Sequence, residues 1–474
     1  MLRCSPAVAR SCRRLLLSRR LLSSASSQCE EYDVVIVGGG PAGLALASAL
    51  GMDPVVLHVL YMSNASLLPG SSQNVRDNLK ISLIEAGDLS KVREWSPVDG
   101  AFSNRCISLT NASQAFLKGN VTSHALGCAT EQSHRGDGGT SPVSLHFPET
   151  YSTPLQVWDG ITDARIHFSA SDLGLDANTQ GMSRITENIN LQRGLLRYLN
   201  TMPDLHLIDK TKVTSIVRED EDSGGWPLIG ADGFNSPVRK YAQIPSYGWS
   251  YDTQAIVATM FHPPRGPFQG PNTTAYQRFL PTGPIAFLPI SPTASSLVWS
   301  TRPQIATAIM ASGPSVVARM INAAYRLPHD SLQYLYNRIL EHQKAGTPIT
   351  ADEIIEEVRF RERAHGIDAI SAYSSSHMME NTVENQGIPP TDSEMLPPLV
   401  TSIQPGTVAS FPLRFNHTES YIGEGQGSRT VLVGDAAHTV HPLAGQGLNL
   451  GLADVECLAR VINDAVLNGS DIGK

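Results

Sequence analysis

The 474-residue sequence has no long apolar run, few cysteines and few charged residues. No stretch approaches the ~18 consecutive apolar residues that a membrane-spanning helix needs. The six cysteines include no CxxC pair, which favours neither a metal site nor a disulfide framework and suits a reducing compartment. Charged residues make up 17% and apolar residues 41% of the chain, as in an ordinary globular protein. We therefore expect a globular protein, soluble or peripheral to a membrane, with no metal site.

Acidic residues are missing from the first 29 positions, which contain six arginines. An Arg-rich leader with serines, leucines and no acid is typical of a mitochondrial transit peptide, so we predict one over residues 1–29. A disordered basic arm that binds nucleic acid or anionic lipid is the alternative. Without the leader's arginines the chain has 30 basic and 44 acidic residues, a net charge of −14. This negative net charge of residues 30–474 argues against a nucleic-acid partner.

A glycine-rich turn, GGGPAG, follows between a β-branched strand (residues 32–37) and a helical segment. In the dinucleotide fingerprint Gly38 makes the tight turn, Gly40 lets the backbone approach a pyrophosphate, and Gly43 lets the helix pack on the strand. The helix N-terminus then offers free N–H groups and a positive dipole end to the phosphates. This strand–turn–helix context indicates dinucleotide binding, and a purely structural glycine turn is the alternative.

The next expected residue is an acid that closes the second strand and accepts hydrogen bonds from ribose hydroxyls. Glu85, at the end of the strand-like residues 80–84, fits this role. It lies 42 residues past Gly43, about twice the ~20 expected, and residues 53–78 account for the excess. We interpret them as a surface insertion or as extra sequence in the gene model. An ordinary solvated glutamate is the alternative for Glu85.

Two later motifs narrow the prediction to one class of flavoprotein. One is LIGADGFNSPVR at 228–239, and the other is RTVLVGDAAHTVHP at 429–442, which continues as LAGQGLNLG. With the glycine loop they resemble the three signatures of the aromatic-ring flavin monooxygenases of the para-hydroxybenzoate hydroxylase type. Three connecting segments resemble, more narrowly, the mitochondrial ubiquinone-biosynthesis monooxygenases: AYQRFLPTGP at 275–284, LVWST at 297–301 and SFPLR at 410–414. The resemblance covers most of residues 30–474.

The last motif also has a physical interpretation of its own. VLVGD is an apolar strand that ends in an acid, so Asp435 can hold a ribityl hydroxyl of the flavin. The following GQGLN turn opens a helix whose N–H groups would face the edge of the isoalloxazine where negative charge accumulates on reduction. Glycines are needed there because the ring lies too close for side chains. Cofactor contacts are therefore predicted at Asp435, Gly445, Gly447, Leu448 and Asn449.

The resemblance implies further cofactor contacts outside this motif. Asp232 and Gly233 would lie near the pyrophosphate. Arg105 and Gln192 would contact the phosphate and ribityl region of FAD, and a surface or core role is the alternative for both.

Histidines in the last motif invite a different interpretation. The spacing of His438 and His441 suggests a metal, but no partnering acid or third ligand is apparent, so we favour packing and backbone hydrogen bonding. His441 and Pro442 are candidates for the lining of the active site. No Ser–His–Asp or HExxH arrangement stands out, which leaves the chemistry to the cofactor.

The resemblance also implies a function. Reduced FAD would react with O2 to a C4a-hydroperoxide that is attacked by a phenol, here a polyprenyl 4-hydroxybenzoate of ubiquinone synthesis. The implied partners are ferredoxin with its reductase as electron donor and a ubiquinone-biosynthesis multiprotein complex, on the matrix side of the mitochondrial inner membrane. A prenylated ring requires an apolar tunnel, and we expect residues 249–301 to form an antiparallel sheet that lines it. A flavin hydroxylase of another phenol and a catalytically impaired flavoprotein of the complex are the alternatives.

We therefore predict an α/β fold, in which a discontinuous Rossmann-like FAD-binding domain is interleaved with an α+β substrate domain that carries an antiparallel sheet. The predicted segments are a transit peptide (1–29), FAD-binding parts (30–120, 181–245 and 411–474), an insertion with the start of the substrate domain (121–180), and the substrate domain (246–410) with a long loop (371–404).

Two features depart from the resembled family. Only the ten residues 218–227 precede the Asp-Gly motif, so we expect the sheet that supports Asp232 to lack a strand or two. The chain also ends soon after the helix that begins near Leu448, whereas the family continues with further helices, so we expect exposed apolar surface there. These departures favour the catalytically impaired alternative.

Overall fold

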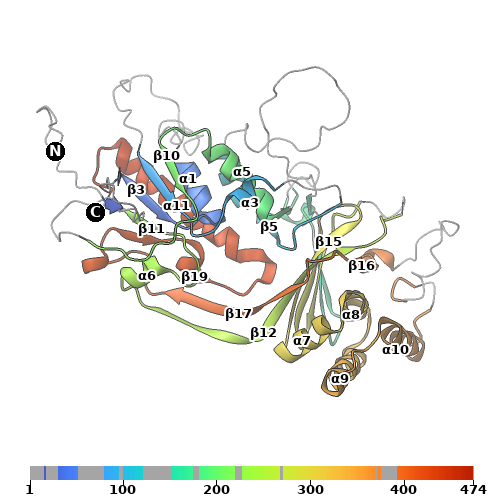
Figure 1. Cartoon of the computed structure of the whole chain (residues 1–474). Coiled ribbons are helices and arrows are strands. Elements are labelled where there is room, and N and C mark those ends of the chain that lie inside the picture. The colour runs from blue at the N-terminus through green and yellow to red at the C-terminus, as the bar shows by residue number, and fades with distance from the viewer. Residues whose placement is uncertain are drawn as a thin grey trace, which may run out of the picture.

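The computed structural model of the chain describes residues 15–17, 30–51, 79–95, 100–120, 151–152, 154–174, 181–218, 227–266, 271–368, 371–374 and 392–472. The predicted insertion at 53–78, most of the predicted leader and residues 375–391 of the predicted loop lie outside them. The described part forms a parallel sheet and a larger, mostly antiparallel sheet, which a long two-stranded ribbon joins (Figure 1).

The parallel sheet has five strands in the order β10–β4–β3–β11–β18. They are β3 (Val34–Val37), β4 (Ile81–Ile84), β10 (Leu205–Ile208), β11 (Leu228–Gly230) and β18 (Thr430–Leu432). Every residue of β3 and β4 is buried, which is typical of a parallel sheet covered on both faces. The strands come from segments that lie far apart in the sequence, so the predicted discontinuous α/β architecture is confirmed.

Helices cover one face of this sheet, where α1 (Pro41–Leu50) contacts both α5 (Asn188–Leu199) and α11 (Gln446–Leu467). Their apolar side chains form one buried cluster with the strands, and burying each such side chain stabilises the fold by roughly 1.5–3 kcal/mol. On the other face α6 (Pro237–Tyr241) packs Val238 against Val35 and Val37. Two further helices are α3 (Ser90–Arg93) and α4 (Asn111–Asn120).

The larger sheet has nine strands, with the path β19–β17–β12–β15–β14–β13–β7–β8 and β16 paired to β12. They are β7 (Leu155–Asp159), β8 (Arg165–Phe168), β12 (Ser246–Phe261), β13 (Ala275–Leu280), β14 (Gly283–Pro289), β15 (Ala294–Thr301), β16 (Ser402–Ile403), β17 (Ala409–Thr418) and β19 (His438–Thr439). The predicted antiparallel sheet over residues 249–301 is therefore confirmed. The predicted loop 371–404 is wrong at its end, because Ser402 and Ile403 pair with β12.

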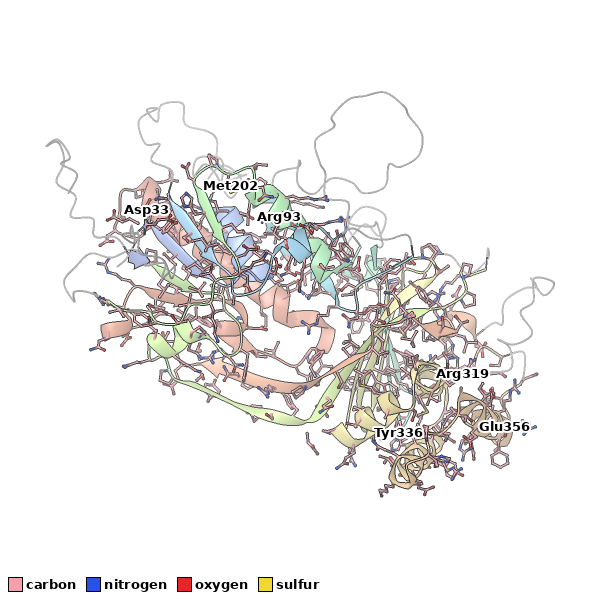
Figure 2. The ribbon with its side chains drawn as sticks, in the orientation of Figure 1. Asp33, Arg93, Met202, Arg319, Tyr336 and Glu356 are labelled. Atoms are coloured by element: carbon pink, nitrogen blue, oxygen red, sulfur yellow. The ribbon has the colours of Figure 1, made fainter. Side chains whose placement is uncertain are left out.

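Four helices lie on the outer side of the larger sheet, and the last of them packs on the two before it. They are α7 (Pro303–Ala311), α8 (Pro314–Arg326), α9 (His329–Ala345) and α10 (Ala351–Ala364). Tyr336 of α9, labelled in Figure 2, is buried with Trp299 and Phe287 of the sheet in one apolar cluster. The opposite face of the sheet is left for the site.

The ribbon of β12 and β17 carries the chain from one sheet to the other. Its register shifts midway: β12 advances four residues, from Ser250 to Gln254, while β17 advances two, from Arg414 to Pro412. Such a bulge bends a strand and re-aims nearby side chains. The ribbon also spans the predicted boundary at residues 410 and 411, and the domain limits stay predictions.

Three short strands, β5 (Cys106–Thr110), β6 (Tyr151–Ser152) and β9 (Ser183–Glu187), form a third sheet, and β1 (Leu15–Leu17) pairs with β2 (Glu30–Tyr32). Short 3-10 turns lie at Ser171–Leu173, Ser393–Met395, Gly425–Gly427, Gly434–Ala436 and Leu443–Gly445.

The segment before Asp232 contains no strand in its described residues, 211–218. Even so, β11 lies between β3 and β18. The strand that leads to Asp232 is therefore supported from both sides.

Candidate active site

A cavity of about 950 Å³ lies where the two sheets face each other. We call its first side the nucleotide wall, formed by the glycine loop, the Asp-Gly segment and the turns from residue 433 to 448. Its second side, the sheet wall, is formed by residues of β12 to β15 and β17. All three predicted motifs therefore meet at one cavity.

The glycine loop has two positions that admit no side chain and one that borders open space. Gly38 has φ +115°, and a Cβ there would lie 2.2 Å from the Ala231 carbonyl oxygen. A Cβ on Gly43 would lie 1.9 Å from the Gly38 carbonyl oxygen, so helix and turn pack too closely for any side chain. A Cβ on Gly40 would meet no atom within 4 Å, and Gly40 lines the cavity at the N-terminus of α1. The space next to these helical N–H groups is open, and the predicted contact of Gly40 with a pyrophosphate stays a prediction.

Glu85 and Gln192 both contact the glycine loop. Glu85 directly follows β4, and its Oε2 accepts a 2.5 Å hydrogen bond from the Gly39 N–H while Oε1 accepts one of 2.5 Å from Gly87. Gln192 on α5 donates from Nε2 to the Gly39 carbonyl at 3.4 Å. Neither residue lines the cavity. Their proposed contacts with ribose and phosphate stay predictions.

The Asp-Gly segment leaves one acceptor unused. Asp232 Oδ2 accepts a 3.1 Å hydrogen bond from the Val238 N–H, whereas Oδ1 is buried with no hydrogen-bond partner among the described residues. Burial raises the pKa of Asp232 above its usual value. Gly233 lines the cavity, whereas Asp232 itself does not. A buried, unsatisfied acceptor is costly, and a cofactor hydroxyl donating to Oδ1 would remove that cost.

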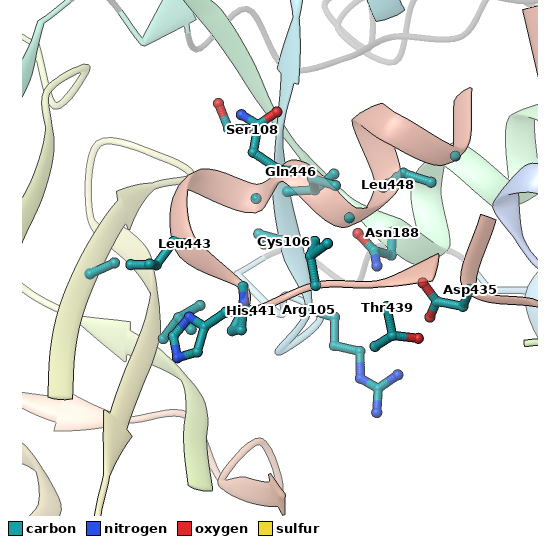
Figure 3. A pocket seen from close by; sticks show the side chains of 18 of the residues that line it. Arg105, Cys106, Ser108, Asn188, Asp435, Thr439, His441, Leu443, Gln446 and Leu448 are labelled. Carbon is teal, nitrogen blue, oxygen red and sulfur yellow. The ribbon is translucent and has the colours of Figure 1, made fainter. Parts of the chain in front are cut away.

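Asp435 follows β18 and is exposed to the cavity, as predicted for a ribityl contact. The surrounding walls desolvate its carboxyl and raise its pKa, and nearby His438 partly opposes this shift. Asp435, Arg105 and Thr439 lie on the same side of the first turn of α11 (Figure 3). Arg105 is also exposed to the cavity, with its Cζ 5.8 Å from the centre of the Phe411 ring.

The first turn of α11 borders the cavity with Gly445, Gly447 and Leu448. Asn449, the fifth predicted contact in this motif, is buried, and its side chain does not line the cavity. Its Oδ1 accepts hydrogen bonds from the Thr110 N–H at 3.0 Å and the Ser113 hydroxyl at 2.8 Å. Its Nδ2 donates to the carbonyls of Ser108 at 2.8 Å and Gly445 at 3.0 Å. The side-chain amide thus links β5 to α11. If Asn449 contacts the cofactor, the contact must be made by its backbone.

The prediction that no acid partners the two histidines is wrong for His438. Its Nε2 lies 2.6 Å from Asp454 Oδ2, which also accepts a 2.9 Å hydrogen bond from the Gly434 N–H. This hydrogen bond raises the pKa of His438. Sequence reasoning missed Asp454 because the contact depends on how α11 packs against the turn after β18.

His441 and Pro442 do line the cavity, as proposed. The His441 ring lies edge-on to Tyr251, with ring centres 5.2 Å apart, and partial burial lowers its pKa. The lowered pKa favours the neutral form of the His441 ring, which faces the cavity.

The sheet wall contains residues to which no role was assigned from the sequence. Small apolar side chains, such as Ala275 and Ala286, surround Gln277 of β13 and Ser300 of β15. Gln277 is 9% exposed, and no hydrogen bond holds its amide within the described residues. The two-residue period of β13, with Ala275 and Gln277 on one face, is the signal that could have identified them. Arg414 of β17 also lines the cavity, 5.0 Å from the centre of the Phe234 ring.

The described residues contain neither a membrane-spanning helix nor a metal-ligand cluster. No helix in them is long and apolar enough to cross a lipid bilayer. No group of three or more His, Cys, Asp or Glu side chains in them is arranged to hold a metal ion.

Comparison with known proteins agrees with this geometry. Residues 379–471 match the FAD binding domain family. The chain is 34% identical over 484 residues to the mitochondrial ubiquinone biosynthesis monooxygenase COQ6 of Saccharomyces cerevisiae, covering 97% of this chain and 84% of the relative. It is 32% identical over 462 residues to the protein of the same name from Schizosaccharomyces pombe, covering 94% and 79%.

The fold is also that of a solved structure. The crystal structure of pqsL, a probable FAD-dependent monooxygenase from Pseudomonas aeruginosa, matches with a TM-score of 0.51 and 17% identity, covering 92% of this chain and 87% of that one. The predicted fold class is confirmed.

Proposed function

Because the chain belongs to the family of the FAD-dependent ubiquinone biosynthesis monooxygenase COQ6, we propose that it hydroxylates the aromatic ring of a polyprenyl 4-hydroxybenzoate-type intermediate of ubiquinone biosynthesis. The observation that carries this proposal is the convergence of three separate motifs on one cavity whose opposite side is a mostly apolar sheet. A flavin on the nucleotide wall would face an aromatic substrate on the sheet wall.

The residues of the nucleotide wall fit FAD. Open space at Gly40 and the N-terminus of α1 would hold the pyrophosphate, and Asp232 Oδ1 offers an unused acceptor. Asp435 would accept a hydrogen bond from the ribityl chain. The N-terminus of α11 would stabilise negative charge on the reduced isoalloxazine. Bound and reduced, FAD supplies the activation of O2.

The sheet wall would bind and orient the substrate. Its alanines, valines and leucines exclude water from the reacting groups and suit an apolar ring with a prenyl substituent. We propose that the amide of Gln277 hydrogen-bonds a polar substituent of the ring and so selects which ring carbon faces the flavin. His441, whose pKa is lowered by partial burial, would line the same space.

Electron supply and location are further parts of the proposal. The yeast relatives are named as mitochondrial proteins, and we propose the same compartment for this chain, peripheral on the matrix side of the inner membrane. We further propose ferredoxin with its reductase as electron donor and membership of a ubiquinone-biosynthesis complex. A fusion of residues 1–29 to a reporter should reach mitochondria, and a cytosolic signal would contradict this.

The test is to purify the full chain, record the flavin absorbance and supply a prenylated 4-hydroxybenzoate with O2. Ferredoxin with its reductase and a nicotinamide alone are compared as reductants. The expected product carries one extra ring oxygen, derived from labelled O2. Bound FAD without ring hydroxylation under either reductant would contradict the proposed activity. It would leave the catalytically impaired flavoprotein as the better description.

A further inference from the structure

The segment Phe102–Arg105, which we call the Arg105 loop, reaches the cavity just before β5. Asn104 and Arg105 both line the cavity. Within the described residues the Arg105 guanidinium has no acidic partner, and its only ring contact there is Phe411. An unpaired cation of this kind is available to a phosphate of the cofactor. What holds this loop in place therefore decides where that cation lies.

One side of the loop is fastened to the FAD-binding part of the chain. The buried carboxylate of Glu187, at the end of β9, accepts a short hydrogen bond from the Ser103 N–H. The N–H of Asn188, in the first turn of α5, donates to the Arg105 carbonyl at 3.0 Å. Both contacts join the Arg105 loop to segments that we predict to belong to the FAD-binding part of the chain.

The other side is fastened to the large sheet. Gln404, between β16 and β17, makes a reciprocal pair with the Phe102 backbone: Oε1 accepts from the N–H at 2.9 Å, and Nε2 donates to the carbonyl at 2.8 Å. The backbone N–H of Gln404 donates in turn to the Thr259 carbonyl of β12 at 2.9 Å. Next to this pair, Asn104 donates to the Thr407 carbonyl at 2.7 Å, and Thr259 donates to the Ser103 carbonyl at 3.2 Å.

We propose that Gln404 is a positioning residue for FAD, which acts through the Arg105 loop from the substrate-binding sheet. The inference rests on the proposed contact between Arg105 and the FAD phosphates. A primary amide suits this role because it offers one acceptor and one donor at the spacing of a backbone N–H and C=O. The large sheet would thus help to hold the loop that binds the cofactor.

The test is FAD titration of the apo-protein, followed by flavin fluorescence. Gln404→Met keeps the side-chain volume and removes both hydrogen bonds without adding charge, and we expect the Kd for FAD to rise about 5- to 10-fold. Gln343→Met, at an exposed glutamine of α9, is the matched control and should leave Kd unchanged. Arg105→Gln should raise Kd by about 10-fold or more.

Two readouts separate positioning from general loosening of the structure. The double variant Arg105→Gln/Gln404→Met should bind FAD no more weakly than Arg105→Gln alone, because Gln404 acts through Arg105. An arginine–phosphate contact is screened by salt, so the dependence of Kd on KCl should weaken in Gln404→Met as it does in Arg105→Gln.

Multiplying effects in the double variant, or an unchanged salt dependence, would overturn the proposal. If Gln404→Met does not fold, Thr407→Val removes the hydroxyl that donates to the Gln404 carbonyl at 2.7 Å and accepts from the Thr259 N–H at 3.1 Å. It should show the same salt signature, and its absence would equally overturn the proposal. No substrate is used, so a failed hydroxylation assay with normal FAD titrations would contradict only the proposed function.

Discussion

The two walls of the cavity are built on different physical principles. The nucleotide wall consists of turns at the ends of parallel strands, where backbone atoms approach so closely that glycine is required at Gly38 and Gly43. The sheet wall consists of side chains on one face of β-strands, where size and polarity matter and many residue types would fold equally well. Changes in the first wall should therefore affect the fold and FAD binding, and changes in the second should affect the substrate.

The largest effect is expected within the glycine loop. Gly43→Ala places a Cβ 1.9 Å from the Gly38 carbonyl oxygen, so we expect the free energy of unfolding of the apo-protein to fall by about 3 kcal/mol. Gly40→Ala meets no atom within 4 Å and should leave that stability unchanged, yet raise the Kd for FAD about 30-fold by filling the phosphate space. Urea denaturation and FAD titration measure the two quantities. Equal effects of both variants on stability would contradict this division of roles.

Asn449 should matter for stability although its side chain does not line the cavity. Asn449→Ala leaves the Thr110 N–H and the Ser108 carbonyl without their side-chain partner, which should cost about 2–3 kcal/mol in the apo-protein. Asn468→Ala, at the exposed end of the same helix, is the control and should cost less than about 0.5 kcal/mol. A loss of FAD affinity in Asn449→Ala at unchanged stability would instead support a direct cofactor contact.

The sheet wall should show the opposite pattern. Gln277→Leu removes the hydrogen-bonding amide from the cavity, so we expect KM for the prenylated substrate to rise about 10-fold. The Kd for FAD should stay within about twofold, because Gln277 lies on the wall away from the nucleotide motifs. Gln156→Leu on β7, outside the cavity lining, is the control for a lost glutamine in this sheet. Steady-state kinetics measure KM, and FAD titration measures Kd. A larger change in Kd than in KM would contradict the assignment of Gln277 to substrate binding.

The smallest effect concerns the His438–Asp454 pair. Because the pKa of His438 is raised in the folded protein, the pair contributes fully below the usual histidine pKa of 6.5 and loses its contribution as pH rises through the raised value. We expect the apo-protein to be about 1 kcal/mol less stable at pH 8.5 than at pH 6.5. Asp454→Asn, which keeps the acceptor for the Gly434 N–H, should flatten this dependence. A pH dependence that is the same in both proteins would show that other groups cause it.

The same contrast explains what could be predicted from the sequence. The nucleotide wall can be recognised in the sequence as a motif, because positions where backbone segments approach closely admit only glycine. Gly38, Gly43 and the turn before α11 could therefore be located without a structure. Gln277 and Arg414 could not, because a strand face becomes a cavity wall only through its packing against another part of the chain. Asp454 was missed for a related reason, since it meets His438 across a helix–turn contact.

The bulge in the ribbon sets a rule for length changes at this point. Between Ser250 and Gln254, β12 contains two more residues than the paired part of β17. Because two is the period of side-chain alternation, the side chains on either side of the bulge stay on the same faces of the ribbon. Deleting one residue there would turn every later side chain of β12 to the opposite face, so that Val257 would point away from the cavity that it lines and its neighbours would point into it. Deleting two would straighten the ribbon and keep each side chain on its own face. Length variation at this point should therefore be tolerated in steps of two.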